Sequence, residues 1–208
     1  MFHVIIFQAG RHGFPQKDTA GADMVTKEKV EQILTAPALK AGLEKYQYIM
    51  GRFRKVDVSE DTEFQSAYRD FYQMRRFYTD EFARKYFRLM EQLKEMDGVT
   101  FKMAFERVKH IQCTYETSFS SKMAHTFNPQ TPIWDKIVTT DHFGLRSPTG
   151  QKDREQKTVR RFEEYSGKFR GYMKSKEGQM FIGMFDKAFP DSGISDVKKI
   201  DFILWLDR

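Results

Sequence analysis

The sequence has little of several features that define common protein classes. It has one cysteine, Cys113, which excludes a disulfide scaffold and an iron–sulfur cluster and is typical of a reducing, cytoplasmic location. Its five histidines form no two-histidine helical pair, so we predict no metal and no cofactor. No apolar run approaches the roughly 20 residues of a membrane span, and we predict no membrane partner.

Sequence motifs of several large enzyme groups are also missing. Gly10 and Gly13 are not followed by Gly-Lys-Ser/Thr, so they do not form a phosphate loop. There is no nucleophile elbow, kinase loop or dinucleotide fingerprint. Apolar residues make up 40% of the chain and include 20 Phe and 11 Met, which is typical of a folded domain. We predict one domain over residues 1–208 and a monomer, because no heptad pattern or long exposed apolar stripe is evident.

Helical periodicity predominates after the first 25 residues. Residues 1–25 form an expected N-terminal arm or loop, in which Phe2–Phe7 is a short strand or a buried extended segment. Pro37 separates two predicted helices, and Thr62 with Gln65 predicts a capping box. The pattern after Asp61 fits one long helix or two helices that separate near Thr79. About eight helices with short loops predict a mainly α fold.

Positive charge is concentrated in residues 152–176, a predicted basic helix. This segment has nine Lys/Arg and four acidic residues, so it carries +5 of the chain's net charge of +6. Clustered Lys and Arg are typical of a surface that binds nucleic-acid phosphates. A solvated helix face of mixed charge is the alternative interpretation.

Residues 118–138 differ from the rest of the chain. They read Ser-Phe-Ser-Ser-Lys-Met-Ala-His-Thr-Phe-Asn-Pro-Gln-Thr-Pro-Ile-Trp-Asp-Lys-Ile-Val, which predicts a short helix, a proline-bounded turn and the start of another helix. This segment, within residues 100–146, resembles the catalytic hairpin-and-turn region of the helix-hairpin-helix DNA glycosylase superfamily, and in particular its divergent 8-oxoguanine-glycosylase-like members. The resemblance implies a helix-hairpin-helix glycosylase-like fold.

The resemblance also implies roles for two residues. The catalytic aspartate of the superfamily matches Asp135, and the amine nucleophile of its bifunctional members matches Lys122. A carboxylate stabilises the positive charge that develops on the sugar when an N-glycosidic bond breaks. An N-cap is the alternative role for Asp135. Lys122 could instead be exposed or bind a phosphate. We therefore expect a monofunctional enzyme, in which water and not an amine is the nucleophile.

Other residues near this segment are candidates for contacts with DNA. Trp134 is a candidate stacking wall for a flipped base or a core residue. Ser121 and His125, four residues apart on one helical face, are candidates for contact with the base or for local hydrogen bonds. The candidate DNA-binding residues are Ser118, Lys136, Arg146, Lys152, Arg154, Arg160 and Arg161.

Together these features predict a DNA glycosylase that leaves an abasic site. The expected target is an oxidised purine or a hypermodified bacteriophage base, and the second target would make the protein a phage-defence enzyme. The alternative is a non-catalytic helical DNA-binding or regulatory protein, in which the basic segment binds DNA and Asp135 only caps a helix.

Overall fold

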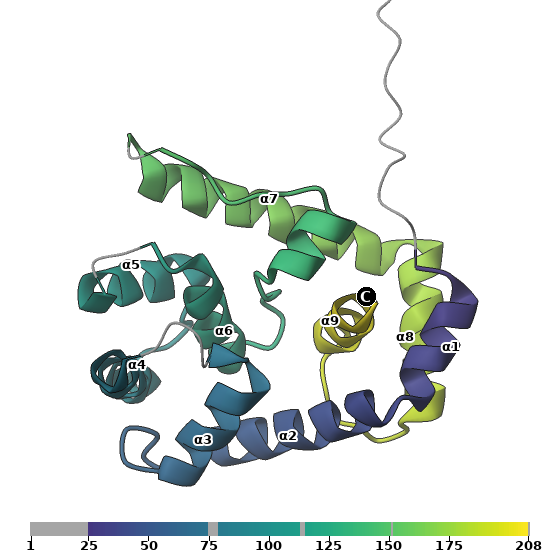
Figure 1. The fold of residues 1–208 in the computed structure, drawn as a ribbon, viewed down its shortest axis with the longest axis horizontal. Coiled ribbons are helices and arrows are strands. Elements are labelled where there is room, and N and C mark those ends of the chain that lie inside the picture. The colour runs from purple at the N-terminus through teal and green to yellow at the C-terminus, as the bar shows by residue number, and fades with distance from the viewer. Residues whose placement is uncertain (1–24, 75–78, 113–114, 151, 208) are drawn as a thin grey trace, which may run out of the picture.

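The computed structural model describes residues 25–74, 79–112, 115–150 and 152–207, and these residues form helices and loops without a strand (Figure 1). The predicted mainly α fold is confirmed. The helices are α1 (Lys27–Thr35), α2 (Pro37–Phe53), α3 (Thr62–Phe71), α4 (Asp80–Gln92), the 3₁₀ segment η2 (Leu93–Glu95), α5 (Phe101–Gln112), α6 (Thr117–Phe127), the π-helical segment η3 (Ile137–His142), α7 (Arg154–Lys174), α8 (Lys176–Ala188) and α9 (Asp196–Leu206). The predicted arm over residues 1–25 lies outside the described residues except for Val25, and so does Cys113. No helix in the described ranges has the length and apolar content needed to span a bilayer.

Short polar side chains fix the beginnings of most of the helices. The side-chain oxygens of Thr26, Asp61, Thr79, Ser175 and Ser195 each accept the backbone N–H three residues later. Pro37 occupies the first position of α2, where its missing N–H costs no hydrogen bond. The predicted break at Pro37 is therefore confirmed.

The region after Asp61 differs from the prediction in one detail. Asp61, one residue before Thr62, is the cap of α3, with its Oδ1 2.7 Å from the Phe64 nitrogen. The Gln65 side chain instead donates to the carbonyls of the preceding loop, at Val58 and Ser59. The predicted capping box is wrong because an ionised aspartate was available one position earlier. Of the two open alternatives for this region, the structure has two helices, α3 and α4.

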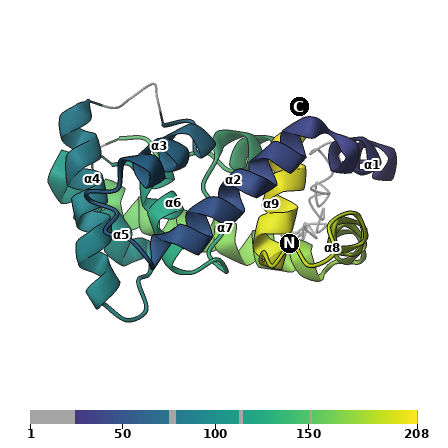
Figure 2. The same ribbon diagram turned by 90° about the horizontal axis from the view of Figure 1, so that it is seen from below.

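Helix α2 crosses the molecule and connects two groups of helices (Figures 1 and 2). At one end it packs against α3, and on the same side of the molecule α4 packs on α5 and α5 on α6, which is the most extensive pairing. At the other end, α1, α8 and α9 pack together. Helix α7 runs along the opposite side and packs on α8 and α9. Helix α9 therefore lies near the centre, between α2 and α7.

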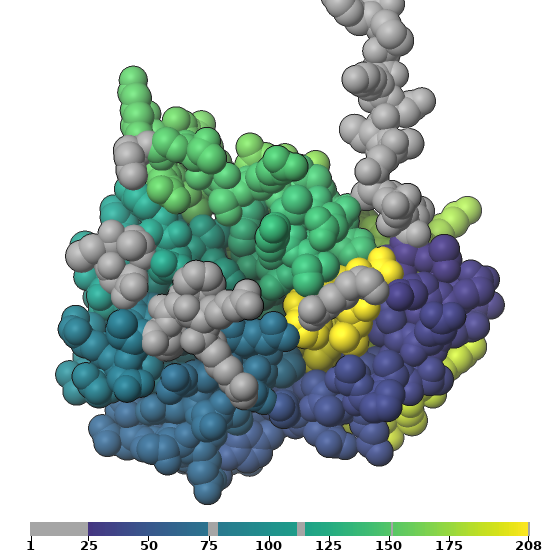
Figure 3. Space-filling view, viewed as in Figure 1, coloured from purple at the N-terminus to yellow at the C-terminus, as the bar shows by residue number. Residues whose placement is uncertain are grey.

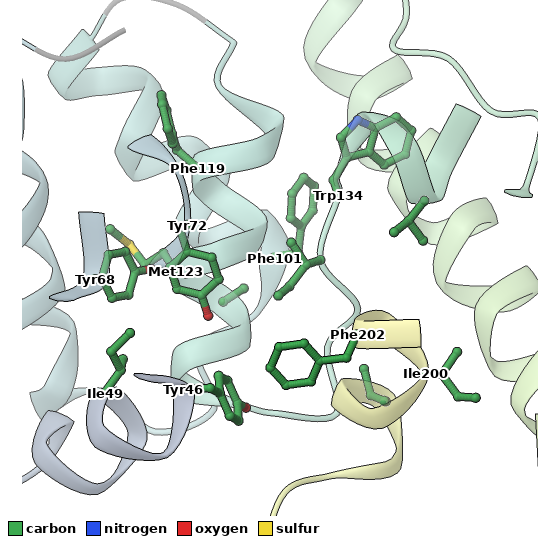
Figure 4. Packing of buried hydrophobic residues seen from close by; sticks show 14 of the residues in the cluster. Tyr46, Ile49, Tyr68, Tyr72, Phe101, Phe119, Met123, Trp134, Ile200 and Phe202 are labelled. Carbon is green, nitrogen blue, oxygen red and sulfur yellow. The ribbon is translucent and has the colours of Figure 1, made fainter. Parts of the chain in front are cut away.

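Aromatic side chains fill the space between these helices (Figure 4). Tyr68 on α3 and Tyr86 on α4 are fully buried, and their hydroxyls lie 3.2 Å apart. Tyr86 also donates to the Phe119 carbonyl at 2.9 Å, which ties α4 to α6. Phe202 extends from α9 toward Tyr46 on α2 in an edge-on contact, with ring centroids 6.2 Å apart. This contact docks α9 against α2.

Candidate functional site

Three lysines and three aspartates from distant parts of the sequence line one pocket of about 250 Å³. The polar residues of this α9 pocket are Lys45, Asp70, Lys122, Asp135, Lys198 and Asp201. Its aromatic walls are Phe71, Tyr72, Phe202 and Trp205. In Figure 3, α9 (yellow) reaches the surface between α1–α2 (purple) and the segment that follows Asp135 (green). The pocket combines flat apolar walls with charged groups, as pockets for polar heterocycles do.

Lys122 lies on α6 with only 8% of its surface exposed. Its Nζ donates to the Tyr72 carbonyl at 3.3 Å and lies 5.5 Å from the centre of the Phe119 ring. No carboxylate of the described residues comes within ion-pairing distance of this amine. Burial lowers the pKa of Lys122 to about 8, although the Asp135 and Asp201 carboxylates oppose the shift. The alternative of an exposed Lys122 is wrong.

Asp135 precedes η3 and lines the same pocket as Lys122. Its Oδ1 accepts the Ile137 N–H at 2.9 Å, and its backbone carbonyl accepts the Thr139 N–H at 2.8 Å. Asp135 therefore caps a helical segment, which is one of the two roles that the sequence left open, and it also lines the pocket. The segment that follows is π-helical, a rare geometry that often occurs at functional sites.

The turn that carries Asp135 is fixed by hydrogen bonds from three helices. The Trp134 N–H donates to Ser121 Oγ on α6 at 2.9 Å, and the Ile133 carbonyl accepts from the Tyr165 hydroxyl on α7 at 2.9 Å. The Pro129 carbonyl accepts from the Ser195 hydroxyl, just before α9, at 2.8 Å. These bonds restrain the position of Asp135 relative to Lys122.

His125 is another fully buried support for this turn. Its Nδ1 lies 2.7 Å from the Thr131 carbonyl, which can only accept, so Nδ1 carries the hydrogen. Nε2 then accepts from the Tyr46 hydroxyl at 2.9 Å. Burial, with the nearby Lys198 charge, lowers the pKa of His125 to about 3, which keeps the ring neutral.

The three residues named as candidates for contact with a base are buried. Ser121 and His125 are fully buried, and Trp134 is 5% exposed with its ring edge-on to Tyr165. None of them lines the α9 pocket. The polar groups of Ser121 and His125 hold the turn, which is the local role that the sequence left open for them. The Trp134 ring packs in the core and also lines a second depression.

The candidate DNA-binding residues fall into two groups. Lys136 and Arg146 are exposed and line a second depression with Thr139 and Thr140, next to Asp135 in the chain. The second group lies on α7 and the residues before it. Lys152 and Arg160 are exposed there.

The remaining members of the predicted set have partners within the protein. Arg161 is paired with Glu164 at 3.3 Å, and the Arg154 guanidinium lies 4.9 Å from the centre of the Tyr115 ring. Ser118 is half-buried on α6, where its carbonyl accepts from Ser121. The basic segment extends over α7 and ends in the first turn of α8.

Sequence analysis missed the charged residues that α9 and the end of α3 contribute. Lys198 and Asp201, on α9, are 3% and 5% exposed and form an ion pair of 2.6 Å. Asp70, on α3, pairs with Lys45 on α2. A signal for the α9 pair exists in the sequence, since Lys198 and Asp201 are three residues apart within a helix whose other residues are mostly apolar.

Comparisons with known proteins found no match among protein-family models, curated proteins or solved structures. Across the described parts of the chain, no group of three or more His, Cys, Asp or Glu side chains is arranged to hold a metal ion. Any functional assignment therefore depends on the geometry of the chain itself.

Proposed function

We propose that this protein is a DNA glycosylase that breaks the N-glycosidic bond of a modified or damaged base. One observation carries the proposal: the buried Lys122 amine and the Asp135 carboxylate, which match the superfamily's two catalytic positions, line the same pocket. A base must leave the duplex to be excised, and the aromatic walls of the α9 pocket suit a flat ring. An oxidised purine or a hypermodified phage base is the proposed target class.

The chemistry follows from the charges of these two groups. As the bond between C1′ and the base breaks, its electron pair leaves with the base and positive charge develops on the sugar. The Asp135 carboxylate stabilises that charge and orients a water molecule, which adds to C1′ and gives up a proton to the carboxylate; the proton then passes to the departed base. This is the proposed monofunctional route.

The structure also supports an amine route through Lys122. With a pKa of about 8, roughly a tenth of the Lys122 amine is neutral at pH 7, whereas an ordinary lysine is almost fully charged. A neutral amine can add to C1′ in place of water. The adduct opens to an imine, which water then hydrolyses to restore the lysine and release the abasic sugar.

An abasic-site assay tests the proposal. Wild-type protein and the Asp135→Asn variant are incubated with undamaged, oxidised, alkylated, deaminated and hypermodified phage DNA, and alkali then cleaves any abasic site. We expect wild type to cleave one substrate class and Asp135→Asn to lose at least about a hundredfold in rate. Asp61→Asn is the matched control, because Asp61 also caps a helix and lies outside the pocket. An equal loss of cleavage rate in both variants would show that Asp135 acts only as a helix cap.

Borohydride trapping separates the two routes. Reduction captures an imine between Lys122 and an abasic aldehyde as a stable protein–DNA adduct, whatever base was removed. Trapping that disappears in Lys122→Gln supports the amine route. Base release without trapping supports the water route.

A non-catalytic DNA-binding protein is the second candidate function. It is favoured by one observation: the Asp135 carboxylate accepts a backbone N–H as a structural cap does. Salt-sensitive DNA binding with no base release from any substrate would support this candidate.

A further inference from the structure

The Lys198–Asp201 ion pair is the most deeply buried charged pair that lines the α9 pocket. The Lys198 ammonium lies 4.4 Å from the centre of the Phe202 ring, 4.8 Å from that of Phe71 and 5.1 Å from that of Tyr46. Its Nζ donates to Asp201 Oδ2 at 2.6 Å. The ammonium is thus held in one place by aromatic faces and a carboxylate.

Stability alone does not account for this pair. Removing two charges from water costs about as much as their attraction returns, and apolar residues of similar size often fold as well or better. The pair also lies on a helix whose other buried residues, apart from Lys199, are apolar. A role in binding is the explanation that its position in the pocket suggests.

The pair has hydrogen-bonding capacity that the protein does not use. Within the described residues, Asp201 Oδ1 has no partner, and Lys198 Nζ uses one of its three N–H groups in a side-chain hydrogen bond. The Tyr72 hydroxyl, which belongs to another residue of the same pocket, is also buried without a partner (Figure 4). Buried polar atoms are nearly always satisfied, so the unpartnered Tyr72 hydroxyl, together with the unused capacity of the ion pair at the same pocket, indicates a polar ligand.

We propose that the Lys198–Asp201 pair reads the hydrogen-bonding edge of the base that enters the α9 pocket. Asp201 accepts from an N–H of that edge, and Lys198 donates to an oxygen or ring nitrogen beside it. Phe71, Phe202 and Trp205 supply flat walls for the ring. The inference rests on the proposed function, since it takes the ligand to be a base from DNA.

A fixed acceptor beside a fixed donor distinguishes bases by the order of their own donors and acceptors. Hypoxanthine presents C6=O next to N1–H, whereas adenine presents a C6 amino group next to an unprotonated N1, so the order is reversed. The two bases have nearly the same shape. A pocket that reads the edge must therefore bind one of them more tightly.

The test is a binding measurement on duplexes that contain one hypoxanthine or one adenine, each opposite the same abasic spacer. We expect wild type to show dissociation constants that differ at least about tenfold between the two duplexes. In the double variant Lys198→Met/Asp201→Leu, which leaves no unpaired buried charge, we expect this ratio to fall to near one. Lys199→Met is the matched control, because Lys199 is the next residue of α9, is also buried and does not line the pocket.

Two results would overturn the inference: equal affinities in wild type, or a ratio that the double variant leaves unchanged. The single variant Asp201→Asn, which keeps the shape of the side chain, is expected to reduce the ratio as well. The test does not depend on base release. Discrimination without release would keep this inference and reject the glycosylase, whereas release without discrimination would do the reverse.

Discussion

The Lys122 amine destabilises the fold that buries it. Its pKa is about 8 in the folded protein and near the ordinary 10.5 in the unfolded chain. The unfolded chain therefore binds the proton more tightly, and the penalty is full below pH 8. Stability is expected to rise as the pH increases from about 8 to 10.5, where the folded protein no longer has to bury the charge.

Replacing Lys122 by methionine removes this penalty. We predict that Lys122→Met raises the free energy of unfolding at pH 7 by roughly 1 to 3 kcal/mol. Urea unfolding at pH 7 measures the change. Lys94→Met is the control and is expected to lower stability, because Lys94 donates to Glu91 and to the Val56 carbonyl, both at 2.6 Å. A less stable Lys122→Met variant would contradict the burial penalty.

At acidic pH, His125 is expected to destabilise the fold. Its folded pKa of about 3 lies below the ordinary 6.5, so the unfolded chain binds the proton more tightly between these values. Stability is therefore predicted to fall by up to about 1.4 kcal/mol per pH unit as the pH drops from 6.5 toward 3. Urea unfolding of wild type and His125→Gln at pH 7 and pH 4.5 isolates this effect. If wild type and His125→Gln lose the same free energy of unfolding between pH 7 and pH 4.5, His125 does not contribute to the acid sensitivity.

At the scale of the helices, α7 and α8 approach each other closely at one glycine. A Cβ at Gly178 would lie 2.2 Å from the Tyr172 carbonyl oxygen and 2.9 Å from the Met173 Cα, both backbone atoms. Backbone atoms cannot move aside as the end of a side chain can. The turn at Ser175 therefore needs a residue without a side chain at this position.

We predict that Gly178→Ala destabilises the protein by at least about 2 kcal/mol, because α8 must shift against α7. Gly183→Ala is the control on the same helix, where nothing lies within 4 Å of the added Cβ. There alanine is expected to be neutral or to stabilise by up to about 1 kcal/mol. Thermal unfolding followed by circular dichroism compares the two variants.

The helices were easier to predict from the sequence than the site. Pro37 and the apolar spacing of 3 and 4 mark boundaries and buried faces, because these signals act within one helix. Lys122 and Asp135 were found through a local resemblance. Lys198, Asp201 and Asp70 were missed because they meet the site only through tertiary packing. For Ser121 and His125 the sequence left two roles open, because a polar side chain that fixes a turn has the same sequence signature as one that binds a ligand.

At the scale of the whole molecule, the chain carries a net charge of +6, and the proposed binding to DNA is expected to depend on salt. Each phosphate neutralised by a lysine or arginine releases counterions, so DNA affinity falls as salt rises. Exposed lysines and arginines without a protein partner are expected to contribute more to this salt dependence than those in ion pairs. Lys136 and Arg146 are both exposed, whereas Arg161 is bound to Glu164.

We predict that Lys136→Gln/Arg146→Gln lowers the slope of log affinity against log salt concentration by about 2, and that Arg161→Gln changes it little. Fluorescence anisotropy at several salt concentrations, with one duplex throughout, gives the slopes. An unchanged slope in the double variant would place the DNA on another surface.

The position of α9 has a consequence for how the protein is made. The pocket draws on α2, α3, α6 and α9, so its walls come from residues 38 to 206. A nascent chain that has reached α8 contains Lys122 and Asp135 but not the helix that closes the pocket around them. The pocket around Lys122 and Asp135 can therefore form only after α9 has been synthesised, and a nascent chain that ends before α9 is expected to lack it.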